Sequence, residues 1–229
     1  MCSRNRVMMR AILPGAVTVA ESAGADPHAY LLPEEAVALG RVAETRRREF
    51  TAGRTCARRA LAELGLPPMP ILSGRDREPL WPHGIVGSIT HCEGYCAAAV
   101  ARASVLAAVG IDAEPDEALP DDVLERVALQ EERTWLRARR HSAMHWDRLL
   151  FSAKESVFKA WFSATAQWLD FTDACVTMDP ERGRFRACIA LPAPAIGASG
   201  TAELTGRYRV AAGRILTALV IERTPLTRS

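Results

Sequence analysis

The predicted order of helices and strands restricts the fold of this chain more than any other feature, because one succession occurs twice. A long helix is expected over residues 44–64, where Gly65 ends it, and another over residues 146–166. Short turns then join consecutive strands, near residues 85–90, 95–101 and 105–113 after the first helix, and near residues 174–178, 185–191, 202–210 and 215–221 after the second. Strands joined by such short turns pair in antiparallel fashion.

This repeat of element order predicts an α+β fold of two pseudo-symmetric halves, each a long helix packed on a small antiparallel sheet. An acidic linker at residues 115–120 divides the chain into an N-terminal half, residues 1–114, and a C-terminal half, residues 115–229. Each half has about a hundred residues, which is enough to bury a core. We therefore expect a ligand in the cleft between them.

Composition excludes several classes of protein. The 229 residues carry 29 basic and 27 acidic side chains, a net charge of +2, whereas a protein that coats nucleic acid is far more basic. The six cysteines contain no C-x-x-C pair, which favours reduced thiols. The first apolar stretch is expected to form a strand over residues 12–13 and 17–19 that a turn at Pro14 and Gly15 splits, and no run reaches the length of a membrane span. The sequence predicts a soluble cytoplasmic protein that binds no membrane.

Two carboxylates follow one another on the third predicted strand of the first half. Asp112 and Glu114 are two residues apart, so both side chains point to the same side of that strand. Oxygen ligands on a rigid strand are typical of Mg²⁺ sites. A strand end that simply reaches solvent explains two such acids equally well, and the D-x-E spacing alone does not decide between these readings.

The only two lysines of the chain, Lys154 and Lys159, lie on the second long helix on either side of Glu155. All 27 other basic residues apart from histidine are arginines, so the two positions are expected to need a compact ammonium group. Glu155 and Lys159 are four residues apart and share a helix face. An ordinary solvated ion pair would show the same spacing, but a carboxylate that completes a metal site beside phosphate-neutralising lysines also fits.

Two further groups could contact phosphate. Thr90 and His91 end the first predicted strand, just before a glycine turn, and offer hydroxyl and imidazole donors. The first long helix is rich in arginine, and Arg46, Arg54 and Arg58 lie near one side of it, where a subset could clamp a terminal phosphate.

Taken together, these stretches resemble the 4′-phosphopantetheinyl transferases of the larger, monomeric class that serves siderophore, polyketide and fatty-acid carriers, and actinobacterial members most of all. The matching segments are residues 46–61, residues 81–91 with the S-x-T-H sequence, residues 109–114 with G-I-D-x-E, and residues 146–161 with K-E-x-x-x-K. They span most of the region from about residue 40 to 170. The pairing of the last two motifs, some forty residues apart, is the most specific part of the resemblance.

The resemblance implies a Mg²⁺-dependent enzyme that moves phosphopantetheine from coenzyme A to a serine of an apo acyl or peptidyl carrier protein and releases adenosine 3′,5′-bisphosphate. Asp112, Glu114 and Glu155 would be the metal ligands, and Glu155, Lys159 and Asp112 the catalytic residues. The residues implied to contact coenzyme A are Arg46, Arg54, Arg75, Thr90, His91, Lys154 and Lys159. The partner supplies the nucleophile, so the chain itself needs no activated serine or cysteine.

One loop departs from the pattern, and two other functions compete with the resemblance. Family members commonly carry a lysine before the proline that matches Pro79, where this chain has Arg75 and Arg77. Clustered acids with lysine also suit a Mg²⁺-dependent nuclease. The arginine runs at residues 46–48 and 137–140 would suit a nucleic-acid-binding module, although the acids nearly cancel the bases. The sequence favours the transferase and no nucleic-acid partner.

Overall fold

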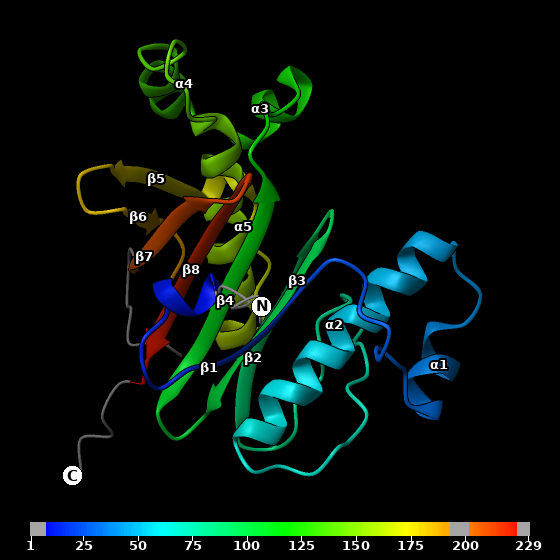
Figure 1. Cartoon of the computed structure of the whole chain (residues 1–229). Coiled ribbons are helices and arrows are strands. Elements are labelled where there is room, and N and C mark those ends of the chain that lie inside the picture. The colour runs from blue at the N-terminus through cyan, green and yellow to red at the C-terminus, as the bar shows by residue number, and fades with distance from the viewer. Residues whose placement is uncertain (1–7, 193–201, 224–229) are drawn as a thin grey trace, which may run out of the picture.

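The computed structural model describes residues 8–192 and 202–223, which form two antiparallel sheets and five α-helices (Figure 1). The helices are α1 (Pro33–Leu39), α2 (Glu44–Glu63), α3 (Asp121–Val127), α4 (Gln130–Arg137) and α5 (Trp146–Thr165), with short 3₁₀ turns η1 (Met9–Ile12) and η2 (Phe171–Asp173). The strands are β1 (Thr18–Ala23), β2 (Ile85–Cys92), β3 (Tyr95–Arg102), β4 (Leu106–Pro115), β5 (Ala174–Asp179), β6 (Arg184–Ile189), β7 (Ala202–Ala211) and β8 (Arg214–Glu222). Among the described helices, none combines the length and apolar character needed to cross a membrane.

The first sheet has the order β1-β3-β2 and carries α2 on one face. Its central strand β3 is buried at every position but the last, and four of its eight residues are alanines. These small side chains let two layers approach β3 closely. Ala98 belongs to the same buried cluster as Cys56 and Leu61 of α2, while Ala99 on the opposite face belongs to the same cluster as Ile111 of β4.

The second sheet has the order β4-β8-β7-β6-β5 and is covered by α5 (Figure 1). Gly110 of β4 permits this packing, because a Cβ there would lie 2.0 Å from the Ser156 carbonyl oxygen and 2.9 Å from Ala160 Cβ. Helix α5 therefore rests directly on the strand that carries Asp112. Its buried face includes Ala153 and Val157 and forms the core of this half.

The α+β fold and the two long helices predicted from the sequence are confirmed, and two details differ. Strand β4 does not pair with β3 but with β8, because β1 and β2 already occupy both edges of β3. The strand expected to begin at residues 12–13 begins at Thr18 instead, and the earlier residues form the 3₁₀ turn η1. The predicted division at residue 114 thus falls within β4, whose partner strand lies at the far end of the chain.

Candidate active site

Asp112 lies where β4, β2 and α5 meet, and it is the centre of the candidate site. Its side chain is buried, and its Oδ1 accepts hydrogen bonds from Lys159 Nζ at 2.7 Å and from Thr90 Oγ1 at 3.2 Å. Lys159 also donates to the carbonyl oxygen of Ile111 at 3.1 Å. Burial disfavours the ammonium charge of Lys159, but the carboxylates of Asp112 and Glu155 more than offset it and raise its pKa. Lys159 therefore stays cationic beside the buried carboxylate.

The edge of β4 that does not pair with β8 donates hydrogen bonds to side-chain hydroxyls of β2 rather than to the backbone of β2. Thr90 Oγ1 accepts from the backbone N–H of Ala113 at 3.0 Å, and Ser88 Oγ accepts from that of Ile111 at 3.2 Å. Both hydroxyls are buried. The hydroxyl of Thr90 thus joins the two sheets and orients Asp112, and the phosphate contact that the resemblance implied stays a prediction.

Glu114 points to the same side of β4 as Asp112 and is held by Arg148, a residue that the sequence-based site omitted. Arg148 Nη1 donates to Glu114 Oε2 at 2.9 Å, and its other nitrogens donate to the carbonyl oxygens of Glu117 and Ala118. Burial and the charge of Asp112 raise the pKa of Glu114 to about 6 although Arg148 opposes the shift. The spacing of Arg148 and Glu155, seven residues or two turns on one helix face, was the available signal for this partner.

Glu155 lies one turn before Lys159 on α5 and is partly buried. Burial raises the pKa of its carboxyl, as does the charge of Asp112, while Lys159 opposes the shift. In the part of the chain that the structure describes, no three Asp, Glu, His or Cys side chains gather closely enough to hold a metal ion. The shared metal site of Asp112, Glu114 and Glu155 therefore stays a prediction. In this structure, Lys159 binds the carboxylate of Asp112 and Arg148 binds that of Glu114.

One atom of this cluster nevertheless fits a cation. Asp112 Oδ2 is buried, and no residue that the structure describes offers it a hydrogen bond. A buried carboxylate oxygen without a partner is costly unless a ligand satisfies it. Burial, and to a lesser extent the charge of Asp112, raises the pKa values of Glu114 and Glu155, and a bound cation would oppose both shifts.

His91 lies between this cluster and the first turns of α2. Its Nε2 is 3.9 Å from Glu49 Oε2. Burial lowers the pKa of the imidazole, Glu49 opposes this shift, and the cations of Lys159 and Arg46 reinforce it. The charges of the Asp112 cluster and of the first turns of α2 thus both act on the pKa of His91, and Arg46 of α2 is exposed; its contact with coenzyme A stays a prediction.

Two predicted phosphate ligands have internal roles instead. Lys154 Nζ forms an ion pair with Glu132 Oε2 at 2.8 Å and donates to the carbonyl oxygens of Val127 and Phe171. Its side chain is 1% exposed, so it points away from the Asp112 cluster into the contact between α5 and α4. Arg54 is also buried and donates to the Ile71 carbonyl oxygen at 2.6 Å. Neither side chain joins the residues that meet at Asp112.

The two cavities beside the cluster differ in their lining. One of about 550 Å³ is lined by Lys159, by Phe158 and by the loop that contains Arg77. The other, of about 500 Å³, is lined by His91 and by the start of α2. Arg75 and Arg77 are both exposed, and Arg77 lines the first cavity whereas Arg75 does not; which of them replaces the family's loop lysine stays a prediction.

Comparison with known proteins identifies the class to which this fold and cluster belong. Residues 34–101 match the 4′-phosphopantetheinyl transferase N-terminal domain, and residues 108–212 match the 4′-phosphopantetheinyl transferase superfamily. The chain belongs to this family and is an enzyme of the phosphopantetheinyl transferase type.

Three actinobacterial relatives are similar over nearly the whole chain. The chain is 48% identical to 4′-phosphopantetheinyl transferase Svp of Streptomyces mobaraensis over 219 residues, which are 93% of this chain and 89% of the relative. It is 42% identical to PptT of Mycobacterium tuberculosis over 93% of this chain and 98% of the relative. It is 43% identical to Npt of Nocardia iowensis over 93% of this chain and 99% of the relative. Family membership favours the transferase over the nuclease and the nucleic-acid-binding module.

Proposed function

We propose that this enzyme transfers the 4′-phosphopantetheine group of coenzyme A to a serine hydroxyl of apo acyl or peptidyl carrier proteins, with Mg²⁺, and releases adenosine 3′,5′-bisphosphate. The observation that carries the proposal is the junction of Asp112, Glu155 and Lys159, which lies within the segment that matches the transferase superfamily. Phosphoryl transfer depends on positioning and on charge neutralisation, which carboxylates able to hold a metal ion and a neighbouring lysine would supply.

The two cavities suit an elongated substrate with chemically different ends. The cavity beside His91 has α2 arginines in its lining and suits the nucleotide phosphates, since guanidinium groups bind phosphate bidentately. The cavity beside Lys159 has aromatic side chains in its lining and suits the pantetheine arm. The diphosphate would then lie between them, near Lys159.

Mg²⁺ fits the proposal through the chemistry of its ligands. Asp112, Glu114 and Glu155 would hold the ion, and buried Oδ2 of Asp112 is the atom whose surroundings support this most directly. When bound, the ion would neutralise charge on the diphosphate of coenzyme A.

The chain's own residues then have distinct tasks. Glu155 takes the proton of the carrier serine, for which a carboxylate of raised pKa is a suitable base. The serine oxygen bonds to the phosphorus next to pantetheine, and the bond from that phosphorus to the oxygen of the leaving nucleotide breaks. Lys159 neutralises negative charge that grows on that oxygen, since its pKa keeps it protonated. Thr90 and Arg148 hold Asp112 and Glu114 in place.

An intact-mass assay tests the proposal. The enzyme is incubated with coenzyme A, Mg²⁺ and a panel of apo fatty-acid, polyketide and peptide carriers. We expect one phosphopantetheine of added mass on a carrier, no gain when its serine is replaced by alanine, and no gain when the metal is chelated. Absence of any gain across the panel, with folded enzyme, would refute the proposal.

The Glu155→Gln variant tests the base. It keeps the size of the side chain but cannot accept the proton, so transfer should fall by about 10²–10⁴-fold while coenzyme A binding persists. A variant that retains most of its turnover would remove Glu155 from this role.

A monomeric state and a cytoplasmic location stay predictions, which the native mass and cell fractionation would check.

A further inference from the structure

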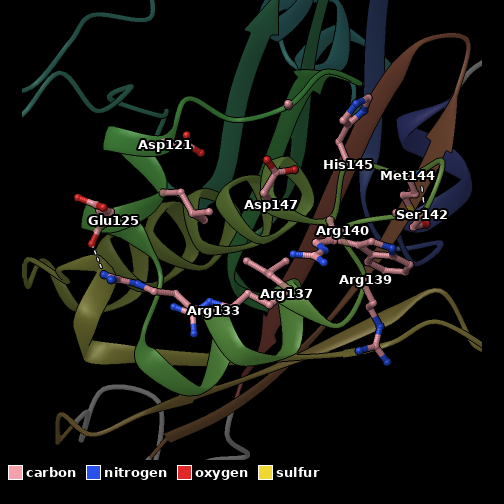
Figure 2. Close-up of a pocket in the computed structure, with 14 residues that line it drawn as sticks. Asp121, Glu125, Arg133, Arg137, Arg139, Arg140, Ser142, Met144, His145 and Asp147 are labelled. Atoms are coloured by element: carbon pink, nitrogen blue, oxygen red, sulfur yellow. Dashed lines mark hydrogen bonds between the residues drawn. The ribbon is translucent and has the colours of Figure 1, made fainter.

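A groove outside the Asp112 cluster lies between α3, α4 and the start of α5 (Figure 2). Its volume is about 640 Å³. Leu124 of α3, Leu136 of α4 and Trp146 of α5 supply its apolar lining. Trp146 packs edge-on against Trp135 with 5.2 Å between ring centroids, so this lining is held from behind. The groove has the size and character that an amphipathic helix would need.

The α4 side of the groove is strongly basic. Arg133, Arg137, Arg139 and Arg140 all line it, and Figure 2 shows that they come from α4 and the turn after it. Within residues 8–192 and 202–223, none of these four guanidinium groups forms an ion pair with a carboxylate. Surface arginines elsewhere do so, as on α3, where an i,i+4 pair closes to 2.7 Å. Charge in the groove is therefore left for an acidic partner.

Two of these arginines are the most available to a partner. Arg137 and Arg140 are exposed, whereas Arg139 stacks on Trp135 with its Cζ 3.8 Å from the ring centroid. Arg133 donates to the backbone carbonyl oxygens of Ala128 and Glu125. The groove thus combines fixed arginines, which shape its wall, with exposed ones at the rim.

The opposite wall carries the other sign of charge. Asp121 and Glu125 stand on the α3 side, and Asp147 at the start of α5 accepts the backbone N–H of Leu119 at 2.8 Å. The field across the groove therefore has a direction. An acidic helix would be attracted to the α4 side and repelled from the α3 side, which sets its orientation.

The groove is connected to the candidate active site through one helix. Asp147 lines the groove, and the next residue, Arg148, holds Glu114 at 2.9 Å. Glu155 is eight residues after Asp147 on α5, which is about 12 Å along the helix axis. A folded partner seated in the groove could thus reach Glu155 with a residue at the edge of its contact surface.

From these observations we infer that the groove docks the carrier protein through an acidic, amphipathic helix. Exposed Arg137 and Arg140 face its carboxylates, and Leu124, Leu136 and Trp146 receive its apolar side chains. This inference rests on the proposed function, because it takes the substrate of the transfer as the occupant. The arginine run that the sequence associated with nucleic acid becomes a protein-docking surface.

Charge reversal at the rim tests the inference with a carrier that the unmodified enzyme has been shown to load. The variant Arg137→Glu/Arg140→Glu should raise KM for the carrier by roughly 10-fold or more, because like charges then meet across the interface. KM for coenzyme A should stay within about twofold, since the groove contacts only the carrier. A carrier with lysines at its acidic helix positions should recover the lost efficiency with this variant.

Arg207→Glu/Arg209→Glu is the matched control, because both of those arginines are exposed on β7. It should leave both KM values unchanged. An unchanged KM for the carrier in the groove variant would overturn the inference without touching the proposed function, which the mass gain reports separately. The enzyme could instead bind a DNA duplex in a salt-sensitive way, and the groove variant could lose this binding while its kinetics with the carrier stay unchanged. That result would assign the groove to nucleic acid.

Discussion

Replacing Lys154 by methionine separates the structural position of this lysine from the phosphate contact that the sequence implied. Methionine keeps the length of the side chain but removes the ammonium group, which bonds to Glu132 and to two carbonyl oxygens. Glu132 is then left buried, at 3% side-chain exposure, without its cation. The backbone N–H groups of Leu129 and Val176 still donate to it at 2.7 Å each.

Removal of one partner of a buried ion pair typically costs 3–5 kcal/mol, and the two remaining donors place the expected loss near the lower end, at about 3 kcal/mol. For a chain of this length that corresponds to a fall of roughly 6–12 °C in melting temperature. Burial lowers the pKa of Lys154 although Glu132 opposes this, so removal of the ammonium recovers the desolvation cost of the lysine, which also places the expected loss near the lower end of the range.

Urea denaturation and thermal unfolding measure the stability loss, and transfer kinetics well below the melting temperature measure function. We expect Lys154→Met to keep KM for coenzyme A, because its ammonium does not join the Asp112 cluster. Lys159→Met is the control and should lose transfer with a smaller loss of stability, since Lys159 is 26% exposed. A Lys154→Met protein that is as stable as the parent but binds coenzyme A poorly would refute this reasoning.

Three further changes test the rest of the site. Thr90→Val removes the hydroxyl between Asp112 and the β4 backbone, so urea denaturation should show a loss of about 2–3 kcal/mol that Thr90→Ser largely avoids; equal stability of Val and Thr proteins would contradict the assigned contacts. Gly110→Ala should unfold the protein or lower its melting temperature sharply, because its Cβ meets the backbone of α5, whereas Gly15→Ala, where the Cβ meets nothing within 4 Å, should be neutral by the same scan. The folded-state pKa of Glu114, about 6, lies above its ordinary value of 4.5, so metal-free protein should lose stability as pH rises from 4.5 to about 6, and Glu114→Gln should remove this loss in urea titrations across that range; identical pH profiles would exclude the shift.

The helices and strands were predictable because their signals are local. The apolar pattern and the terminating glycine gave α2 within a residue, and the second long helix likewise. The partner of β4 was not predictable, because it depends on β1 taking the edge of β3, and no local pattern specifies which of two buried strands pair. For β4, the order of the strands in the sequence therefore did not identify the strand beside it in the sheet.

Site residues were predictable where their spacing in the sequence places them on one face of a helix. The prediction failed where spacing does not fix a shared face. Glu155 and Lys159 share a face of α5, and Lys159 does reach Asp112. Lys154 and Lys159 are five residues apart, which places them about 140° apart around the helix. This angle indicated that they do not serve one site, and it was a better guide than the rarity of lysine in the chain. The hydroxyl of Thr90 could not have been assigned, because its acceptor lies on a strand that does not pair with its own.

The pairing of β4 with β8 joins two segments that are about a hundred residues apart in the sequence, since Asp112 stands opposite Thr217. During synthesis, the strand that bears Asp112 leaves the ribosome about a hundred residues before its partner exists. All three strands of the first sheet have been synthesised by then, but the second sheet, which carries Asp112, still lacks β8. We therefore expect that a polypeptide cut off before β8 retains Asp112 but does not assemble the cluster around it, because β4 then lacks its partner strand in the second sheet.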